Sequence, residues 1–269
     1  MDFSRFSSGG GAEMENNKMG RLNGKIALVT GAGQGVGQGI AFALANEGAR
    51  VAVTGRTLAK LEATCAEIQR RGGEALPIEC NVKNPASLQA CVDTVVSHFG
   101  GLQILVNNAQ EVPLGTLLDV SEDAFNAGWE SGPLATFRLM KLCYPHLKGD
   151  GCIINLGSSA AKRWDMSRYG AYAAVKEAIR ALTRAAACEW GVDNIRCNAI
   201  LPHAKSPGLQ GWMEKNPAEA AAFVRTIPQR RVGDCEDDIG RFVAMLCSAE
   251  SSYINGQSIG IDGGQALIS

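Results

Sequence analysis

The sequence has no block of basic residues and almost no net charge. Its 26 Lys and Arg residues are balanced by 27 Asp and Glu residues, which leaves a formal charge of −1. Association with nucleic acid or with an anionic membrane surface depends on concentrated positive charge. We therefore expect neither of them as the main partner.

The chain also lacks an uninterrupted apolar run of membrane-spanning length. Its longest uncharged stretch, residues 26–46, is broken by five glycines, two glutamines and an asparagine. Residues 1–20 are polar and rich in Gly, Ser and Asn, without the apolar core of a signal peptide. They are predicted to form a disordered tail outside the fold.

A cysteine pattern typical of metal sites or disulfide frameworks is missing as well. The nine cysteines are odd in number, scattered, and never spaced C-x-x-C. This pattern favours a protein without metal in a reducing cytoplasm.

Short apolar runs alternate with longer amphipathic segments along the chain. The short runs are rich in Val, Ile and Leu, as strands buried on both faces are; they lie at 26–30, 51–54, 75–80, 104–107, 152–156, 195–200 and 258–261. The helical segments lie at about 36–47, 57–71, 85–99, 121–147, 169–190 and 236–248, with an irregularity expected at Pro133. This order predicts an α/β fold with a doubly wound, seven-stranded parallel sheet and helices on both faces.

We find no internal repeat and no interdomain linker, so residues 21–269 are predicted to form one domain. Residues 202–217 contain three prolines and two glycines after a strand. A loop of this length is either a lid over a binding site or a floppy insertion. Its place at the carboxyl end of a strand favours the lid.

A glycine-rich turn, T-G-A-G-Q-G-V-G at 30–37, follows the first strand and opens the first helix. Glycines allow the backbone to approach a pyrophosphate, and the helix N-terminus offers unpaired N–H groups to it. This context predicts a dinucleotide site that includes Gly31, Gly33, Gln34, Gly35, Val36 and Gly37.

The end of the second strand bears on which dinucleotide is bound. An NAD site usually carries a carboxylate there for the ribose 2′-hydroxyl, but this chain has Thr54-Gly55-Arg56-Thr57. Arg56 is suited to hold a 2′-phosphate; the alternative interpretation is that it is a solvated arginine at the start of a helix. NADP(H) is the expected cofactor, and NAD stays an alternative.

Tyr172 and Lys176 lie one turn apart on the same face of a predicted helix. A free phenol has a pKa of about 10, and a neighbouring ammonium would lower it towards the working range of an acid/base catalyst. Upstream, I-N-L-G-S-S ends the fifth strand, where the hydroxyl of Ser158 or Ser159 would hold a substrate oxygen beside the phenol.

These motifs together resemble the short-chain dehydrogenase/reductase family over residues 22 to about 265. The resemblance is to its single-domain 3-oxoacyl reductase-like and hydroxysteroid dehydrogenase-like members. The matching pieces are the glycine-rich turn, N-N-A at 107–109, S-S at 158–159, Y-A-A-V-K at 172–176, N-A-I-L-P at 198–202 and I-D-G-G at 261–264. The resemblance implies a Rossmann fold, a homodimer or homotetramer, and NAD(P)(H)-dependent interconversion of a small-molecule ketone and a secondary alcohol.

The resemblance also implies a role for each site residue. Tyr172 would be the general acid/base, Lys176 would hold the nicotinamide ribose, and a serine would polarise the carbonyl. Spacing to the tyrosine selects Ser159, whereas the strand pattern selects Ser158, which we favour. The remaining cofactor contacts would come from Asn81, Val82, Asn107, Asn108, Ala109, Pro202 and Ser206.

The sequence departs from the family pattern at four positions. Gln110 and His203 replace glycines, and Asn81 replaces an acid. Gly132 replaces a helix asparagine that supports a proton relay to the lysine, and we expect it to leave a gap that water fills. NADPH-dependent carbonyl reduction is favoured; the alternatives are an NAD-dependent alcohol or diol dehydrogenase and a nucleotide-binding regulator without turnover.

Substrate contacts are expected from residues near the predicted lid and the nicotinamide site. Large apolar side chains there would either line a substrate pocket or pack the lid onto the body. The candidate contacts are Gln110, Trp164, His203 and Trp212.

Overall fold

The structure is a computed structural model that describes residues 20–163 and 168–266. The predicted tail at 1–20, apart from Gly20, lies outside the described residues. Within them, no helix is both long and apolar enough to span a bilayer.

Seven parallel strands form one sheet in the order β3-β2-β1-β4-β5-β6-β7. This arrangement confirms the predicted doubly wound α/β fold. After β3 the chain returns to the middle of the sheet, where β4 pairs with β1 and the strand order reverses, so a crevice opens beyond the carboxyl ends of these two strands. The strands are β1 Ile26–Thr30, β2 Arg50–Gly55, β3 Ala75–Glu79, β4 Ile104–Asn107, β5 Gly151–Leu156, β6 Ile195–Pro202 and β7 Ser258–Ile261.

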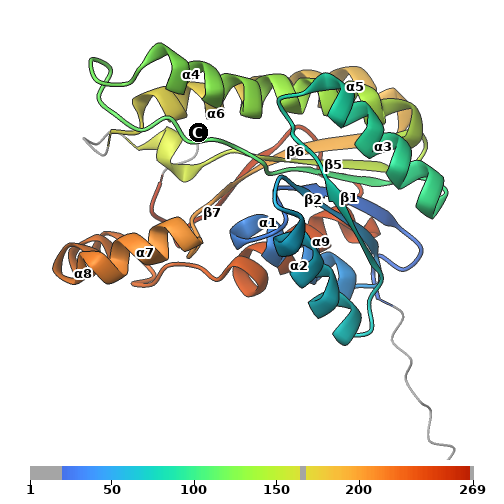
Figure 1. Cartoon of the computed structure of the whole chain (residues 1–269), viewed down its shortest axis with the longest axis horizontal. Helices are drawn as coiled ribbons and strands as arrows, with labels where there is room; N and C mark the ends of the chain where they lie inside the picture. The colour runs from blue at the N-terminus through green and yellow to red at the C-terminus, as the bar shows by residue number, and fades with distance from the viewer. Residues whose placement is uncertain (1–19, 164–167, 267–269) are drawn as a thin grey trace, which may run out of the picture.

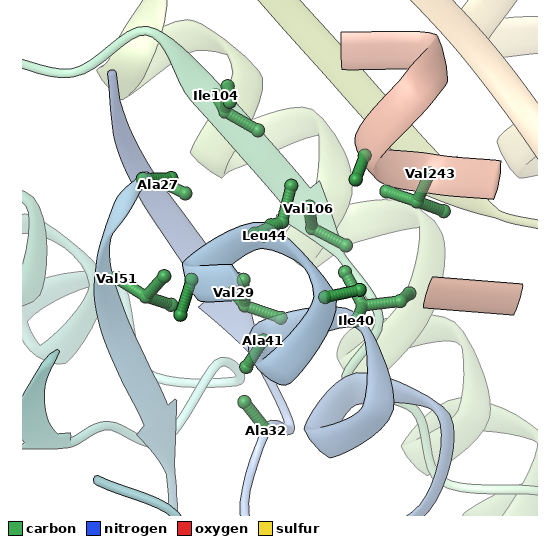
Figure 2. Packing of buried hydrophobic residues seen from close by; sticks show 14 of the residues in the cluster. Ala27, Val29, Ala32, Ile40, Ala41, Leu44, Val51, Ile104, Val106 and Val243 are labelled. Atoms are coloured by element: carbon green, nitrogen blue, oxygen red, sulfur yellow. The ribbon is translucent and has the colours of Figure 1, made fainter. Parts of the chain in front are cut away.

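Helices cover both faces of the sheet (Figure 1). One face carries α1 Gly35–Asn46, α2 Leu58–Arg70 and α9 Arg241–Cys247; the other carries α3 Pro85–Phe99, α4 Glu122–Trp129, α5 Ala135–Leu147 and α6 Gly170–Trp190. Alternate residues of β1 pack into the two hydrophobic cores, one on each face of the sheet. Ala27 and Val29 belong to the same buried cluster as Ile40 of α1 (Figure 2), whereas Leu28 belongs to the cluster of the opposite face. Both faces of β1 are therefore buried, which explains its unbroken apolar sequence.

The irregularity expected at Pro133 takes the form of a π-helical turn. This turn, η1 at Glu130–Leu134, joins α4 to α5, and its three central residues are buried. Proline has no N–H to donate to the preceding helical turn, so the regular α-helical hydrogen bonding is interrupted there.

The prediction that residues 202–217 form a loop is wrong. They contain α7 at Pro207–Lys215, and α8 follows at Pro217–Thr226. Pro207 and Pro217 occupy the first positions of these helices, where a missing N–H costs nothing. The side chain of Ser206 accepts a hydrogen bond from the N–H of Leu209.

Candidate active site

A cleft of about 520 Å³ lies beyond the carboxyl ends of the strands at the crossover point. It contains most of the residues predicted to bind the cofactor. These are Gly31, Gly33, Gln34, Gly35, Val36, Arg56, Asn81, Val82, Asn108, Ala109 and Ser206. Gly37, Pro202, Tyr172 and Lys176 are not among its lining residues. Gly37 lies in α1 behind the turn, and Pro202 ends β6.

The glycine-rich turn keeps its backbone open to the cleft. Gly31 and Gly35 have φ values of 65° and 62°, in the left-handed region that favours glycine. A Cβ at Gly33 would lie 3.0 Å from Cβ of Lys60, and a Cβ at Gly37 would overlap Nδ2 of Asn108. A glycine-rich turn at the start of α1 fits the pyrophosphate of a dinucleotide.

Asn108 supports this turn by holding it against β4. Its Nδ2 donates to the carbonyls of Thr30 and Gly31, at 2.9 and 3.1 Å. The hydroxyl of Thr30 accepts from the backbone N–H groups of Asn108 and Ala109, both at 3.0 Å. Thr30 was not among the predicted site residues, although its place directly before the glycines was the available signal.

Charged side chains from three loops meet at the end of the cleft near β2. Nη1 of Arg56 lies 2.9 Å from Oε1 of Glu111, and Nζ of Lys83 lies 3.2 Å from the same oxygen. All three residues line the cleft. Glu111 and Lys83 were missed because the loops that carry them are distant in sequence and share no motif with Arg56.

Tyr172, Ser158 and Lys176 are brought together by α6 and β5. The hydroxyls of Tyr172 and Ser158 are hydrogen-bonded to each other. Nζ of Lys176 lies 5.4 Å from the centre of the Tyr172 ring and donates to the carbonyl of Leu156 at 2.7 Å. Ser159 is buried within a 3₁₀ turn at Ser159–Lys162. Of the two serines, Ser158 is therefore the one that contacts the phenol.

The expectation that Lys176 lowers the pKa of Tyr172 is wrong for this structure. Burial raises the pKa of the Tyr172 phenol to about 12, although the hydrogen bond with Ser158 acts in the opposite direction. Burial also lowers the pKa of Lys176 to about 7. A low-dielectric site disfavours both charges, and the lysine is directed at the Leu156 carbonyl rather than at the phenol oxygen.

The gap expected beside Gly132 is also absent. A Cβ at this position would overlap Oε1 of Gln110 and would lie 2.9 Å from Cγ1 of Val175. Glutamine is long enough to reach from the loop after β4 to the π-helical turn, so its amide fills the space.

The residues predicted to contact the substrate do not line the same cleft. Gln110 lines the cofactor cleft, whereas His203 lines a separate cleft of about 480 Å³. His203 and Trp212 both pack edge-on against Phe223 of α8, with ring centres 5.3 and 5.9 Å apart. Trp164 lies outside the described residues. Among the described residues, no group of three His, Cys, Asp or Glu is placed to hold a metal.

Comparison with known proteins places this fold and cleft in one family. The family model described as enoyl-(acyl carrier protein) reductase matches residues 31–266. A 12alpha-hydroxysteroid dehydrogenase from a Clostridium species is 38% identical over 255 residues, which cover 91% of this chain and 98% of that protein. A versicolorin reductase from Emericella nidulans is 34% identical over 257 residues, with 91% and 96% covered.

Solved structures agree with this placement. A short-chain dehydrogenase from Burkholderia cenocepacia in complex with NADP superposes with a TM-score of 0.85 at 33% identity, covering 91% of this chain and 99% of that one. A putative short-chain alcohol dehydrogenase from Sinorhizobium meliloti gives a TM-score of 0.85 at 35% identity, with 91% and 98% covered. The fold and site define an α/β oxidoreductase with a nicotinamide dinucleotide cleft. The chain belongs to the short-chain dehydrogenase/reductase family.

Proposed function

We propose that this protein is an NADP(H)-dependent oxidoreductase that reduces a ketone to a secondary alcohol. The observation that carries the proposal is the hydrogen-bonded pair of Tyr172 and Ser158 beside the buried Lys176. A proton donor and a second hydroxyl at one point are what a carbonyl oxygen needs as it gains negative charge.

When bound in the cleft, a nicotinamide cofactor would supply the hydride for the carbonyl carbon. Ser158 donates a hydrogen bond to the carbonyl oxygen, and Tyr172 transfers its proton to that oxygen as the alkoxide develops. A phenol with a pKa of about 12 is still a stronger acid than a secondary alcohol, so the transfer is favourable in this direction. The ammonium form of Lys176 holds the cofactor ribose by donating hydrogen bonds to it.

Preference for NADP(H) is supported by the charges at the end of the cleft near β2. Arg56 and Lys83 bring two cations there, and they share the single carboxylate of Glu111. A 2′-phosphate would compete with Glu111 for both cations. Structural neighbours in complex with NADP, from Burkholderia cenocepacia, and with NADPH, from a metagenomic library, support the same choice.

Substitution Arg56→Ala should weaken NADPH binding by about 10- to 100-fold, the scale of a hydrogen-bonded charge pair. NADH binding should change little, because NADH has no 2′-phosphate. Titration of cofactor fluorescence with both dinucleotides measures the two affinities. As the matched variant, Glu111→Gln should strengthen NADPH binding. Equal losses of affinity for NADPH and for NADH in Arg56→Ala would rule out a role of Arg56 in binding the 2′-phosphate.

The substrate we propose is a bulky cyclic ketone, bound under α7 and α8 acting as a lid. Ser206, Pro207 and Gly208, at the start of this segment, line the cofactor cleft. Trp212 and Phe223 give it an apolar interior. Two relatives, a 12alpha-hydroxysteroid dehydrogenase and a probable tetrahydroxynaphthalene reductase, are named for polycyclic substrates.

A homodimer or homotetramer is the assembly we propose, working in the cytoplasm, where the nine free thiols would stay reduced. Phe125, Trp129 and Phe137 on α4 and α5 are each at least 36% exposed, an apolar surface that a second copy would cover. Light scattering at micromolar concentration should give two or four times the chain mass of 28.4 kDa. A monomer mass would contradict the proposal.

A further inference from the structure

Gln110 and Gly132 form a complementary pair between the loop after β4 and the π-helical turn. A Cβ at position 132 would lie 3.0 Å from Cδ of Gln110 and 2.9 Å from Cγ1 of Val175. Val175 directly precedes Lys176 on α6. The Gln110 amide therefore fills the space beside Gly132, against the segment of α6 that carries Lys176.

Two backbone carbonyls fix the orientation of this amide. Nε2 of Gln110 donates to the carbonyls of Glu111 and Gly128, at 2.7 and 2.8 Å, with Oγ of Ser131 at 3.5 Å. Turning the amide over would set its oxygen against two carbonyl oxygens, so the nitrogen must face them. The oxygen is consequently directed the other way.

Oε1 of Gln110 is buried and has no hydrogen-bond partner among the described residues. A buried carbonyl without a donor is costly, and such groups in proteins are commonly satisfied by an ordered water. The nearby Lys176 is buried as well, and one of its three donors is used by Leu156 within the described part of the chain. The acceptor thus lies beside Val175, the residue that directly precedes the buried cation on α6.

We propose that Gln110 is a positioning residue whose Oε1 holds ordered water connecting Lys176 to solvent. Gly132 makes this possible because any side chain there would displace the amide. This proposal rests on the proposed function, the reduction of a ketone. Each turnover takes one proton from Tyr172, and Lys176 restores it. The water held at Gln110 then gives a proton to Lys176, and bulk water gives a proton to that water.

A high-resolution crystal structure of the wild-type protein tests the placement without any assay. We expect an ordered water within hydrogen-bond distance of Oε1 of Gln110, linked directly or through one more water to Nζ of Lys176. Gln110→Met, which keeps the side-chain volume without the carbonyl, should lack this water. A dry Oε1, or a protein donor bound to it, would overturn the proposal even if the enzyme reduces ketones.

Kinetics test the relay itself, with a ketone that the wild type reduces. Gln110→Met should lower kcat about tenfold, while KM for NADPH and the melting temperature stay close to the wild type. Gly132→Asn alone should be damaging because its side chain overlaps Gln110. The double variant Gln110→Gly with Gly132→Asn, which supplies the amide from the helix, should recover most of the rate. If Gln110→Met keeps wild-type kcat, the carbonyl has no role in turnover.

Discussion

Tyr172→Phe should lower turnover by about 10²- to 10⁴-fold, the usual contribution of a positioned acid/base group. The substitution keeps the ring but removes the only proton that Tyr172 can donate to the product oxygen. NADPH affinity should stay nearly unchanged, because Tyr172 is not among the residues that line the cofactor cleft. Steady-state rates and cofactor titrations on the same preparation separate the two effects.

Tyr169→Phe provides the matched control for this experiment. The Tyr169 ring lies 5.8 Å from that of Tyr172, so the control removes a neighbouring phenol while leaving Tyr172 in place. Its turnover should remain close to that of the wild type. Substantial activity in Tyr172→Phe, or an equal loss in both variants, would show that the assigned proton donor is wrong.

Ser158→Ala should cost about a hundredfold or more in rate, the scale of a lost oxyanion donor, and Ser159→Ala should cost much less. Ser158 is hydrogen-bonded to the phenol, whereas Ser159 is buried in the following turn. The hydrogen bond with Ser158 lowers the pKa of Tyr172, so its removal should raise that pKa further. Alcohol oxidation needs the phenolate, and its rate profile in Ser158→Ala should therefore move to higher pH.

The reverse order of the two serine effects would contradict this assignment. It would mean that the spacing to the tyrosine, rather than the strand pattern, places the catalytic hydroxyl. A pH profile of oxidation that does not move in Ser158→Ala would contradict the role of the Ser158 hydrogen bond.

The features that could be predicted from sequence are those set by local pattern. Strands such as Ile26–Thr30 are short apolar runs because both of their faces are buried. The glycine-rich turn follows from the need for open backbone. α7 was missed because Pro207 and Pro217 indicate a loop, although each of them occupies the first position of a helix.

Contacts between distant segments could not be predicted in this way. Nothing in the sequence indicates that Gln110 reaches the space beside Gly132, because this depends on how the loop after β4 meets the π-helical turn. The pairing of Arg56 with Glu111 depends similarly on three loops meeting at one edge. The pKa directions of Tyr172 and Lys176 depend on burial, which a motif does not record.

The most direct test of the proposed function is to follow NADPH absorbance while the wild-type protein meets a panel of steroid and polycyclic aromatic ketones. The proposal predicts oxidation of NADPH in equal amount to alcohol formed with at least one of them, and a loss of that activity in Tyr172→Phe. A wild type that binds NADPH but oxidises it with no ketone in the panel, beside a Gly132→Asn variant that does, would contradict the account.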